Sequence, residues 1–220
     1  KVNVIIIDDC NLHQGTIDPW KEIARNFNTA FEIVRMDTPL EECLRRDALR
    51  EKPVGAHVIW GMAMQYKLYT PQKGYVICDI DGTIADCEHR RHFVRGEWEK
   101  NYRSFFAAMK DDIIIVVTAY KIGTHVVEGY DLIFVSGRPD SHRELTEKWL
   151  RDNGLTFYKA LFMRRAEDHR PDTEVKQQIL DTYFPDRSLI HCVYDDRPSI
   201  IRLWREAGLR VIDVGYGKEF

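Results

Sequence analysis

The sequence lacks the features that mark membrane-bound, secreted or disulfide-bonded proteins. No apolar run approaches the roughly 20 residues of a membrane-spanning helix, since the longest, Ile113 to Val117, has the length of a strand. Asp8 and Asp9 interrupt the first apolar run, so we expect no signal peptide. The 5 cysteines form no Cys-x-x-Cys pair, which indicates reduced thiols. These absences predict a cytoplasmic protein without membrane contact.

A strong excess of charge of one sign is also missing. The net charge of -3 over 220 residues gives no overall attraction to nucleic acid, so binding of a polyanion depends on local groups. Basic residues gather at 89–95 and at 164–170, where a solvated surface is the simplest interpretation. With 44% hydrophobic and 30% charged residues, the chain has the composition of a globular protein with a core.

Apolar runs alternate with helical patterns along the chain, which predicts an α/β fold with a parallel sheet flanked by helices. The runs expected as strands are residues 4–7, 75–78, 132–135 and 189–194. The segments expected as helices are 19–27, 39–50, 142–153, 173–180 and 198–207. Residues 111–127 remain open, because their β-branched content favours a strand and their position favours a helix. A domain boundary is expected near 68–74.

Acidic and polar residues follow three of the expected strands. Asp79 and Asp81 follow the second, Ser136 and Arg138 the third, and Asp195 with Asp196 the fourth. The carboxyl ends of parallel strands share one edge of a sheet, where ligand sites form. Clustered carboxylates repel one another unless a cation lies among them, and Mg²⁺ suits carboxylates combined with a substrate phosphate.

The segment Asp79-Ile80-Asp81-Gly82-Thr83 suits phosphoryl transfer. In an extended chain residues two apart share a side, so both carboxylates can face one ligand. One can attack phosphorus covalently, while the other protonates the leaving oxygen and then activates water. Gly82 permits a tight turn that brings backbone N–H groups near an anion. Ser136 and Lys176 could hold phosphate oxygens, although a solvent-exposed lysine is the simpler interpretation of Lys176 taken alone.

Four motifs in this order resemble those of the haloacid-dehalogenase-like (HAD) phosphatases: 79–83, 135–138, Lys176 and 195–196. The resemblance implies that Asp79 is the nucleophile and that Asp81 is the general acid/base, its backbone carbonyl also contacting Mg²⁺. It implies that Ser136 and Lys176 bind the phosphoryl group. The implied metal ligands are Asp79, Asp81, Asp195 and Asp196, and the implied substrate contacts are Gly82, Thr83, Gly137, Arg138, Arg164, Arg170 and Arg197.

Further residues narrow the resemblance to the 3′-phosphatase domain of bacteriophage-type polynucleotide 5′-kinase/3′-phosphatases. They are Trp98, Phe105-Phe106, Asp111-Asp112, Arg164 to Lys176, and Asp195 to Arg205. This similarity covers roughly residues 73–220, and the expected phosphatase domain is 71–220. It implies a Mg²⁺-dependent enzyme that acts on nucleic-acid 3′ ends in repair, in the host cytoplasm if a phage encodes it. Members of this family often assemble through their domains, so a homo-oligomer is compatible with the resemblance, which does not define the oligomeric state. No motif in the sequence distinguishes a preference for DNA from a preference for RNA.

Residues 1–70 resemble the C-terminal part of the same family's P-loop kinase domain. Asp9 in Ile6-Ile7-Asp8-Asp9-Cys10-Asn11-Leu12 matches its general base, and Arg46 and Arg50 match its lid arginines. Nothing matches Gly-x-x-x-x-Gly-Lys-Ser/Thr, so no loop cradles ATP phosphates. Since Lys1 leads directly into a buried-strand pattern, we expect upstream sequence, and we expect kinase activity only if a P-loop lies there.

Two alternatives to a polynucleotide phosphatase stay open. One is a HAD phosphatase acting on a small nucleotide or sugar phosphate. The other is an inert nucleic-acid-binding or oligomerisation module with vestigial catalytic residues. The intact motifs disfavour the second, and the arginines with the kinase-like segment disfavour the first.

Overall fold

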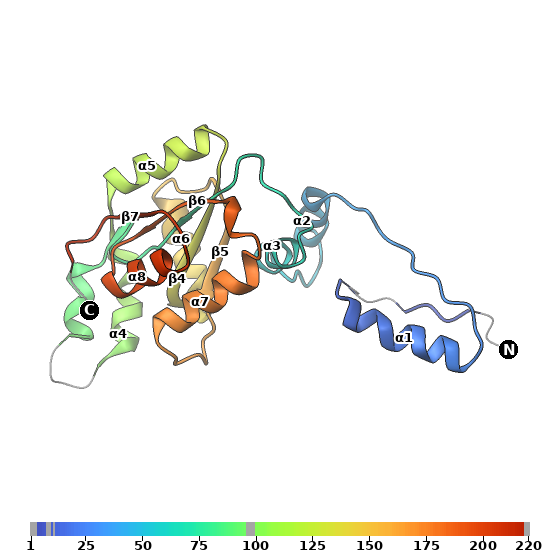
Figure 1. The fold of residues 1–220 in the computed structure, drawn as a ribbon. Coiled ribbons are helices and arrows are strands. Elements are labelled where there is room, and N and C mark those ends of the chain that lie inside the picture. The colour runs from blue at the N-terminus through green and yellow to red at the C-terminus, as the bar shows by residue number, and fades with distance from the viewer. Residues whose placement is uncertain (1–3, 8–9, 11, 96–99, 218–220) are drawn as a thin grey trace.

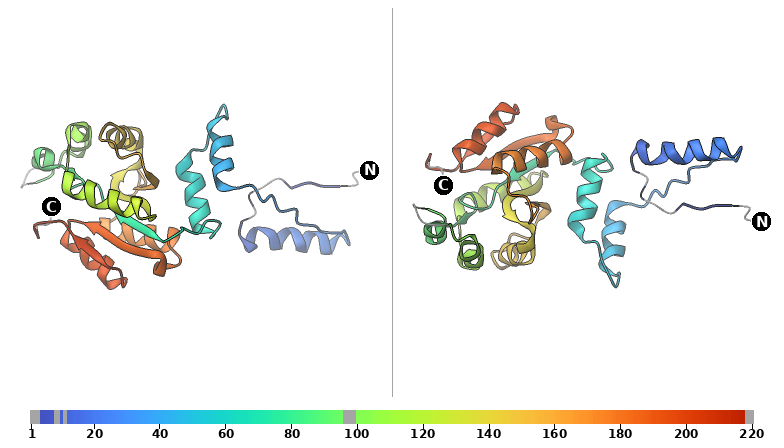
Figure 2. Two further views of the ribbon diagram at one scale, coloured as in Figure 1. Left: turned by 90° about the horizontal axis from the view of Figure 1, so that it is seen from above. Right: turned by 90° about the horizontal axis from the view of Figure 1, so that it is seen from below.

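A five-stranded parallel sheet forms the centre of the chain, with the strand order β5-β4-β1-β6-β7. The computed structural model describes residues 4–7, 10, 12–95 and 100–217. Figures 1 and 2 show helices on both sides of this sheet and α1 apart from it. Among the described helices, none is long and apolar enough to cross a bilayer.

Three helices precede the first strand, and strands and helices alternate after it along most of the described chain. The sheet strands are β1 (Tyr75–Cys78), β4 (Asp131–Pro139), β5 (Tyr158–Arg164), β6 (Ile190–Asp195) and β7 (Val211–Asp213). The α-helices are α1 (Gln14–Asn26), α2 (Leu40–Ala48), α3 (Ala56–Gln65), α4 (Tyr102–Ala107), α5 (Val116–Val127), α6 (Arg143–Asp152), α7 (Asp172–Tyr183) and α8 (Pro198–Glu206). A second sheet pairs β2 (Ala85–Asp86) with β3 (Ile113–Ile114), and the 3₁₀ helix η1 (Glu88–Phe93) follows β2.

The sheet buries apolar side chains on both faces, as continuous apolar strands require. Residues of β1 alternate between the two cores: Tyr75 and Ile77 lie in one, Val76 and Cys78 in the other. Helices α3, α7 and α8 contribute to the first core, and α5 and α6 to the second. Burial on both faces holds the strand ends, and the polar residues after them, in fixed positions.

Most of the predicted elements are confirmed. The strands expected at 75–78, 132–135 and 189–194 form β1, part of β4 and most of β6. The helices expected at 39–50, 142–153, 173–180 and 198–207 form α2, α6, α7 and α8. Gly154 and Gly208 lie just beyond the C-terminal ends of α6 and α8, with φ of 74° and 80°. This is the left-handed conformation that glycine adopts readily after a helix.

The stretch left open at 111–127 contains both structures. Ile113–Ile114 forms β3, and α5 begins two residues later. The prediction did not separate them because valine and isoleucine favour strands, whereas the buried Thr118 and Ile122 lie four residues apart on one face of a helix. Two sheet strands, β5 and β7, were not predicted. The first mixes Lys159, Ala160 and Leu161, which are no strong strand formers, and the second has 3 residues.

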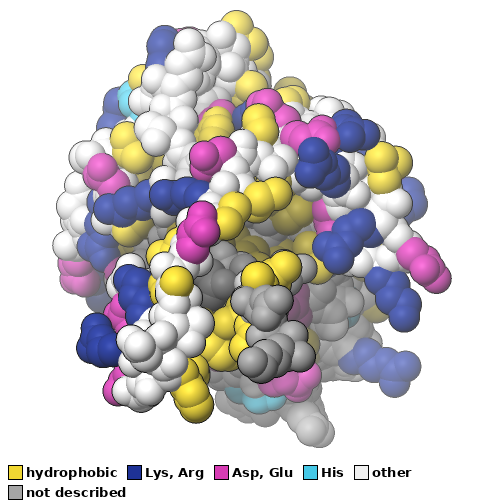
Figure 3. All heavy atoms as spheres, turned by 90° about the vertical axis from the view of Figure 1, so that its right-hand side faces the viewer, with side chains coloured by type: hydrophobic (Ala, Val, Ile, Leu, Met, Phe, Trp, Pro, Cys, Tyr) yellow, Lys and Arg dark blue, Asp and Glu magenta, His cyan; other side chains and the backbone are white. Residues whose placement is uncertain are grey.

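The predicted strand at residues 4–7 is wrong. These residues lie outside any helix or strand, and Val4, Ile5 and Ile6 are 72%, 82% and 85% exposed. A buried parallel strand needs a neighbouring strand, and no described residue pairs with this one. Figure 3 shows the side of the molecule on which the N-terminal part of the chain lies, and apolar side chains are exposed near the middle of this face.

Helix α1 also begins earlier than expected. The sequence predicts a helix from residue 19, but the helix starts at Gln14. His13 is the cap, since its Nδ1 accepts from the Gly15 N–H at 3.0 Å. Pro19 therefore lies inside the helix and deprives the carbonyl of Gly15 of its usual donor. No residue of α1 is buried.

Candidate active site

The carboxyl edge of the sheet collects the predicted carboxylates. Asp79 directly follows β1, and its N–H donates to the carbonyl of Tyr194 on the neighbouring strand at 3.0 Å. Asp195 ends β6 and Asp196 follows it. Oxygens of the three buried carboxylates lie within 4.8 Å of one another. This set is called the acidic cluster below.

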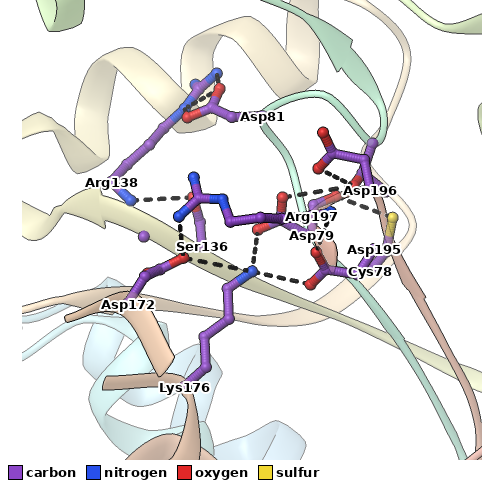
Figure 4. A network of polar contacts seen from close by, with 12 residues as sticks. Cys78, Asp79, Asp81, Ser136, Arg138, Asp172, Lys176, Asp195, Asp196 and Arg197 are labelled. Atoms are coloured by element: carbon purple, nitrogen blue, oxygen red, sulfur yellow. Dashed lines mark hydrogen bonds and ion pairs between the residues drawn. The ribbon is translucent and has the colours of Figure 1, made fainter. Parts of the chain in front are cut away.

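Lys176 of α7 reaches the acidic cluster from the side. Its Nζ donates to Asp79 Oδ1 at 2.8 Å and to Asp195 Oδ2 at 3.0 Å (Figure 4). The side chain is 2% exposed, so the solvent-exposed interpretation is wrong. Burial alone lowers the pKa of Lys176, but Asp195 and Asp79 together raise it above its ordinary value, so the amine stays charged. Trp204 Nε1 also donates to Asp195 Oδ2, at 3.1 Å.

The acidic cluster has the properties of a divalent-cation site. Burial raises the pKa of Asp79 well above its ordinary value, and Asp195 and Asp196 add to the rise while Lys176 opposes it. Burial and the neighbouring Asp195 raise the pKa of Asp196 to about 6. Lys176 donates to two of these carboxylates and Arg91 Nη2 lies 3.4 Å from Asp196 Oδ2, so two cations face three buried carboxylates. An oxygen-only donor set with excess negative charge fits a hard ion such as Mg²⁺.

Small residues allow the loops to approach Asp196. Gly82 has φ of 83°, and a Cβ there would lie 2.1 Å from Asp196 Oδ2. A Cβ on Gly215 would lie 2.0 Å from the carbonyl oxygen of Asp196. Thr83 is fully buried and its hydroxyl donates to Asp196 Oδ1 at 3.2 Å. The glycine and threonine of the Asp79–Thr83 segment thus shape the acidic cluster.

Asp81 is directed away from the acidic cluster in this structure. Its carboxylate accepts from Arg138 Nε at 3.0 Å and from Arg90, and both arginines are fully buried. Both guanidinium groups also donate to Asp112, Arg90 Nε at 2.7 Å and Arg138 Nη2 at 2.8 Å. Burial raises the pKa of Asp81, but Arg138 and Arg90 outweigh it and hold that pKa below its ordinary value. Phe105 covers Arg90, whose guanidinium lies 4.2 Å from the ring centroid.

One donor in this network has no partner among the described residues. Nη1 of Arg138 is buried and makes no hydrogen bond with any described residue. A buried, charged donor without an acceptor is costly unless a ligand supplies one, and a phosphate oxygen is a suitable acceptor. Ser136, also buried, accepts from the Arg138 N–H at 3.2 Å through its Oγ (Figure 4).

The other predicted substrate arginines differ in their exposure and in their hydrogen-bond partners. Arg164 donates to the carbonyl of Gly137 in β4 at 3.1 Å, to two carbonyls of the loop between β5 and α7, and to Asp172, so it joins that loop to β4. Arg197 contacts Asp172 at 3.2 Å beside Lys176. Arg170 is exposed and pairs with Asp168 at 2.6 Å, outside the buried site.

The predicted kinase residues lie away from this site. Arg46 of α2 is exposed and donates to Glu42 at 2.6 Å, and Arg50 follows α2 and lies 3.7 Å from Asp47. Asp9 lies outside the described residues, as do Asn11 and Trp98 of the family segments.

Sequence reasoning missed three polar residues of the site. Arg90 was assigned to a solvated basic patch, but it is 0% exposed. Asp112 was only part of a family motif, and it joins Arg90 to Arg138 from the turn before β3. Asp172 lies between Arg164, Lys176 and Arg197. A Cβ on Gly137 would lie 2.5 Å from Asp172 Oδ1, so a larger residue at position 137 would displace the Asp172 carboxylate. Charge alone in the sequence gives no signal of such burial.

Comparison with known proteins agrees with this geometry. Residues 73–219 match the family described as the phosphatase domain of polynucleotide kinase PNKP. A protein described as a bifunctional polynucleotide kinase/RNA ligase of Autographa californica nuclear polyhedrosis virus is 25% identical, in an alignment over 218 residues covering 92% of this chain. This chain spans only 30% of that relative's length.

Solved structures share the fold. Two structures of the Pnkp1/Rnl/Hen1 complex, one of them described as an RNA repair complex, match with TM-scores of 0.55 and 0.56 and identities of 22% and 23%. The matches cover 92% and 97% of this chain and 71% and 72% of the other chains. A phosphatase fold from Clostridium difficile matches 68% of this chain and 89% of its own length, with a TM-score of 0.50 and 18% identity.

These observations agree on one assignment. The matched residues contain the acidic cluster, Lys176 and the buried arginine network, and they form the parallel sheet of a HAD phosphatase. The chain therefore belongs to the family of polynucleotide kinase PNKP phosphatase domains, which are HAD-type phosphoric monoester hydrolases.

Proposed function

We propose that this chain is a Mg²⁺-dependent phosphatase that removes terminal 3′-phosphates from DNA or RNA in the repair of nucleic-acid ends. The observation that carries the proposal is the position of Asp79, buried at the end of the central strand between Lys176 and the two other carboxylates of the acidic cluster. The family match over residues 73–219 supports a polynucleotide as the substrate.

Asp79, Asp195 and Asp196 would hold Mg²⁺, and the backbone carbonyl of Asp81 is a further candidate ligand. When bound, the ion lowers the repulsion among the carboxylates and neutralises phosphate charge. Lys176, with its two carboxylate partners, holds the nucleophile and supplies a second positive charge. Its buried ammonium is positioned to bind a phosphate oxygen together with Ser136.

The reaction proceeds in two displacements. A carboxylate oxygen of Asp79 attacks phosphorus, and the bond from phosphorus to the 3′ oxygen breaks, which leaves an aspartyl phosphate. The 3′ oxygen takes a proton from Asp81 and departs as a hydroxyl. A water molecule then gives its proton to Asp81 and attacks phosphorus, which frees Asp79 and inorganic phosphate.

Asp81 must change its contacts to serve as the acid. In the structure it is a carboxylate paired with Arg90 and Arg138, so it lies in the state that accepts a proton. An incoming phosphate that takes over Nη1 and part of the guanidinium of Arg138 would weaken this pair. The pKa of Asp81 would then rise toward the range in which it can donate.

The arginines outside the network are proposed to recognise the polynucleotide. Arg197 and Arg164 lie near the rim of the site, and Arg170 is exposed beside them. Bidentate guanidinium groups suit backbone phosphates. Residues 1–70 are proposed to be the C-terminal part of a kinase-like domain, and residues 71–220 the phosphatase domain.

The test compares a 3′-phosphorylated oligonucleotide with a nucleoside 3′-monophosphate in the presence of Mg²⁺. We expect kcat/KM to be at least tenfold higher for the oligonucleotide, and we expect Arg170→Ala to lower only that value. Equal efficiency on both substrates would support a small-molecule phosphatase instead. Absence of turnover with either substrate would support an inert binding module.

A further inference from the structure

A second group of metal-ligating side chains lies at the opposite edge of the sheet from Asp79. His125 comes from the last turn of α5, and His191 and Cys192 come from the start of β6. One ligand atom from each lies within 4.8 Å of the others. The proposed phosphatase reaction uses none of these residues.

A β-bulge places His191 and Cys192 on the same side of the sheet. Neighbouring residues of a regular strand point to opposite faces. The pairing of β1 with β6 shifts here, because Tyr75 and Val76 face Ile190 and Cys192 and leave His191 unpaired as an extra residue. Ile190 and Val193 accordingly lie in the first core, although two residues separate them. The bulge is what brings both side chains toward α5.

The distances are close to those of a tetrahedral zinc site. His125 Nε2 lies 3.9 Å from Cys192 Sγ, and a nitrogen and a sulfur bound to one zinc ion are about 3.6 Å apart. His191 is held by Tyr130, whose ring stacks on it at 4.3 Å between centroids. Cys192 is 0% exposed and the side chain of His125 is 17% exposed. A small rotation of these side chains would bring all three donors around one ion.

The other side of the His125 ring is arranged as in a metal-bound histidine. Its Nδ1 is buried without a hydrogen-bond partner among the described residues, and Glu128 Oε2 lies 3.6 Å away, just beyond bonding distance. A carboxylate beside Nδ1 favours the proton there and leaves Nε2 free to bind. In the structure Nε2 contacts the Tyr194 hydroxyl at 3.0 Å, and an ion would replace that contact.

We propose that His125, His191 and Cys192 form a binding site for Zn²⁺ or a similar thiolate-preferring divalent cation, with water as the fourth ligand. Cys192 binds as the thiolate and releases its proton to solvent. The donor set of two imidazoles and one thiolate suits Zn²⁺, whereas Mg²⁺ prefers the oxygens of the acidic cluster. The ion would join the end of α5 to β6, the strand that carries Asp195.

Cobalt provides a direct test, because a thiolate bound to Co²⁺ gives an intense near-ultraviolet charge-transfer band that oxygen ligands do not give. The metal-free protein is titrated with Co²⁺ in excess Mg²⁺, which keeps the acidic cluster occupied. We expect the band to saturate at one equivalent of Co²⁺ and to disappear when Zn²⁺ is added. A saturating concentration of Zn²⁺ should also raise Tm by several degrees.

Variants assign the band to its ligands. We expect Cys192→Ser to abolish it and His125→Gln to weaken Co²⁺ binding at least tenfold. Cys43→Ser, a thiol control on α2, and Asp79→Asn, which alters the acidic cluster, should both leave the band unchanged. A wild-type protein without the band overturns the proposal even if a variant fails to fold. So does a band that persists in Cys192→Ser.

Discussion

At the scale of single residues, the buried charges decide the chemistry of the site. Arg90, Arg138, Asp81 and Asp112 form a set with two positive and two negative groups, all nearly or fully removed from water. Such a set is stable only while every member keeps its partners, since one unpaired buried charge costs several kcal/mol. Asp112 touches no part of the acidic cluster, yet it positions both arginines that hold Asp81.

Asp112 and its neighbour Asp111 form a matched pair for testing this network. Asp112→Asn leaves Arg90 and Arg138 sharing the single charge of Asp81, and we expect it to lower the free energy of unfolding by roughly 3 kcal/mol. It should also lower kcat. Asp111→Asn, whose side chain is 57% exposed, should change stability by less than about 0.5 kcal/mol. Urea unfolding measures both, and equal effects would show that the network is not stabilising.

Gly82 and Gly154 give a second residue-scale comparison. Both have positive φ, so an alanine at either costs roughly 1–2 kcal/mol of backbone strain. Only at Gly82 would the new Cβ also meet Asp196, because nothing lies within 4 Å at Gly154. We expect Gly82→Ala to abolish the rise in Tm that Mg²⁺ causes and Gly154→Ala to keep it. Thermal unfolding with and without Mg²⁺ decides between them.

At the scale of elements, sheet topology brings the site together. The carboxyl ends of β1, β4 and β6 meet because these strands are parallel neighbours, and α7 brings Lys176 across their ends. The sequence predicted this much, since each strand and the motif after it could be recognised. It did not predict η1, whose short 3₁₀ turn carries Arg90 inward, because a six-residue basic segment has no periodicity that separates a buried arginine from exposed ones.

The connection between α2 and α3 depends on one buried carboxylate. Asp47 Oδ1 accepts from the Val54 N–H at 3.0 Å and Oδ2 from the Gly55 N–H at 2.9 Å, at the start of α3. Asp47→Ala removes both acceptors, and we expect a loss of about 1–3 kcal/mol. Glu51→Ala in the same connection, where the side chain is exposed, is the control. If the two variants unfold alike, the carboxylate does not hold the connection.

At the scale of the whole molecule, the two parts of the chain differ in how far the sequence could predict them. Within residues 73–95 and 100–217 the expected strands and helices form, because these strands bury both faces against helices of the same chain, although β5, β7 and η1 were not predicted. Residues 4–7 have the composition of a buried strand and yet lie exposed. An apolar segment forms a buried strand only where a neighbouring strand is available to pair with it. The orientation of Asp81 was likewise unpredictable, since it depends on arginines 9 and 57 residues away.

Removal of the metal tests the electrostatic account of the whole domain. Without a divalent ion, the acidic cluster keeps an unbalanced negative charge in a buried site. We expect a chelator to abolish phosphatase activity, excess Mg²⁺ to restore it, and saturating Mg²⁺ to raise Tm by several degrees. In Asp196→Asn the rise in Tm should be smaller. Full activity in the presence of the chelator would contradict a metal-dependent site.

The role of Asp79 as the nucleophile is the central claim, and trapping the covalent intermediate tests it most directly. An oligonucleotide with a radiolabelled 3′-phosphate is mixed with excess enzyme and Mg²⁺, and the reaction is stopped in acid within milliseconds to seconds. We predict label on the protein that hydroxylamine releases, as expected of an acyl phosphate. The label should be absent in Asp79→Asn and present in Asp152→Asn, an exposed control on α6. Turnover by Asp79→Asn at the wild-type rate, or label that persists on it, would contradict the account.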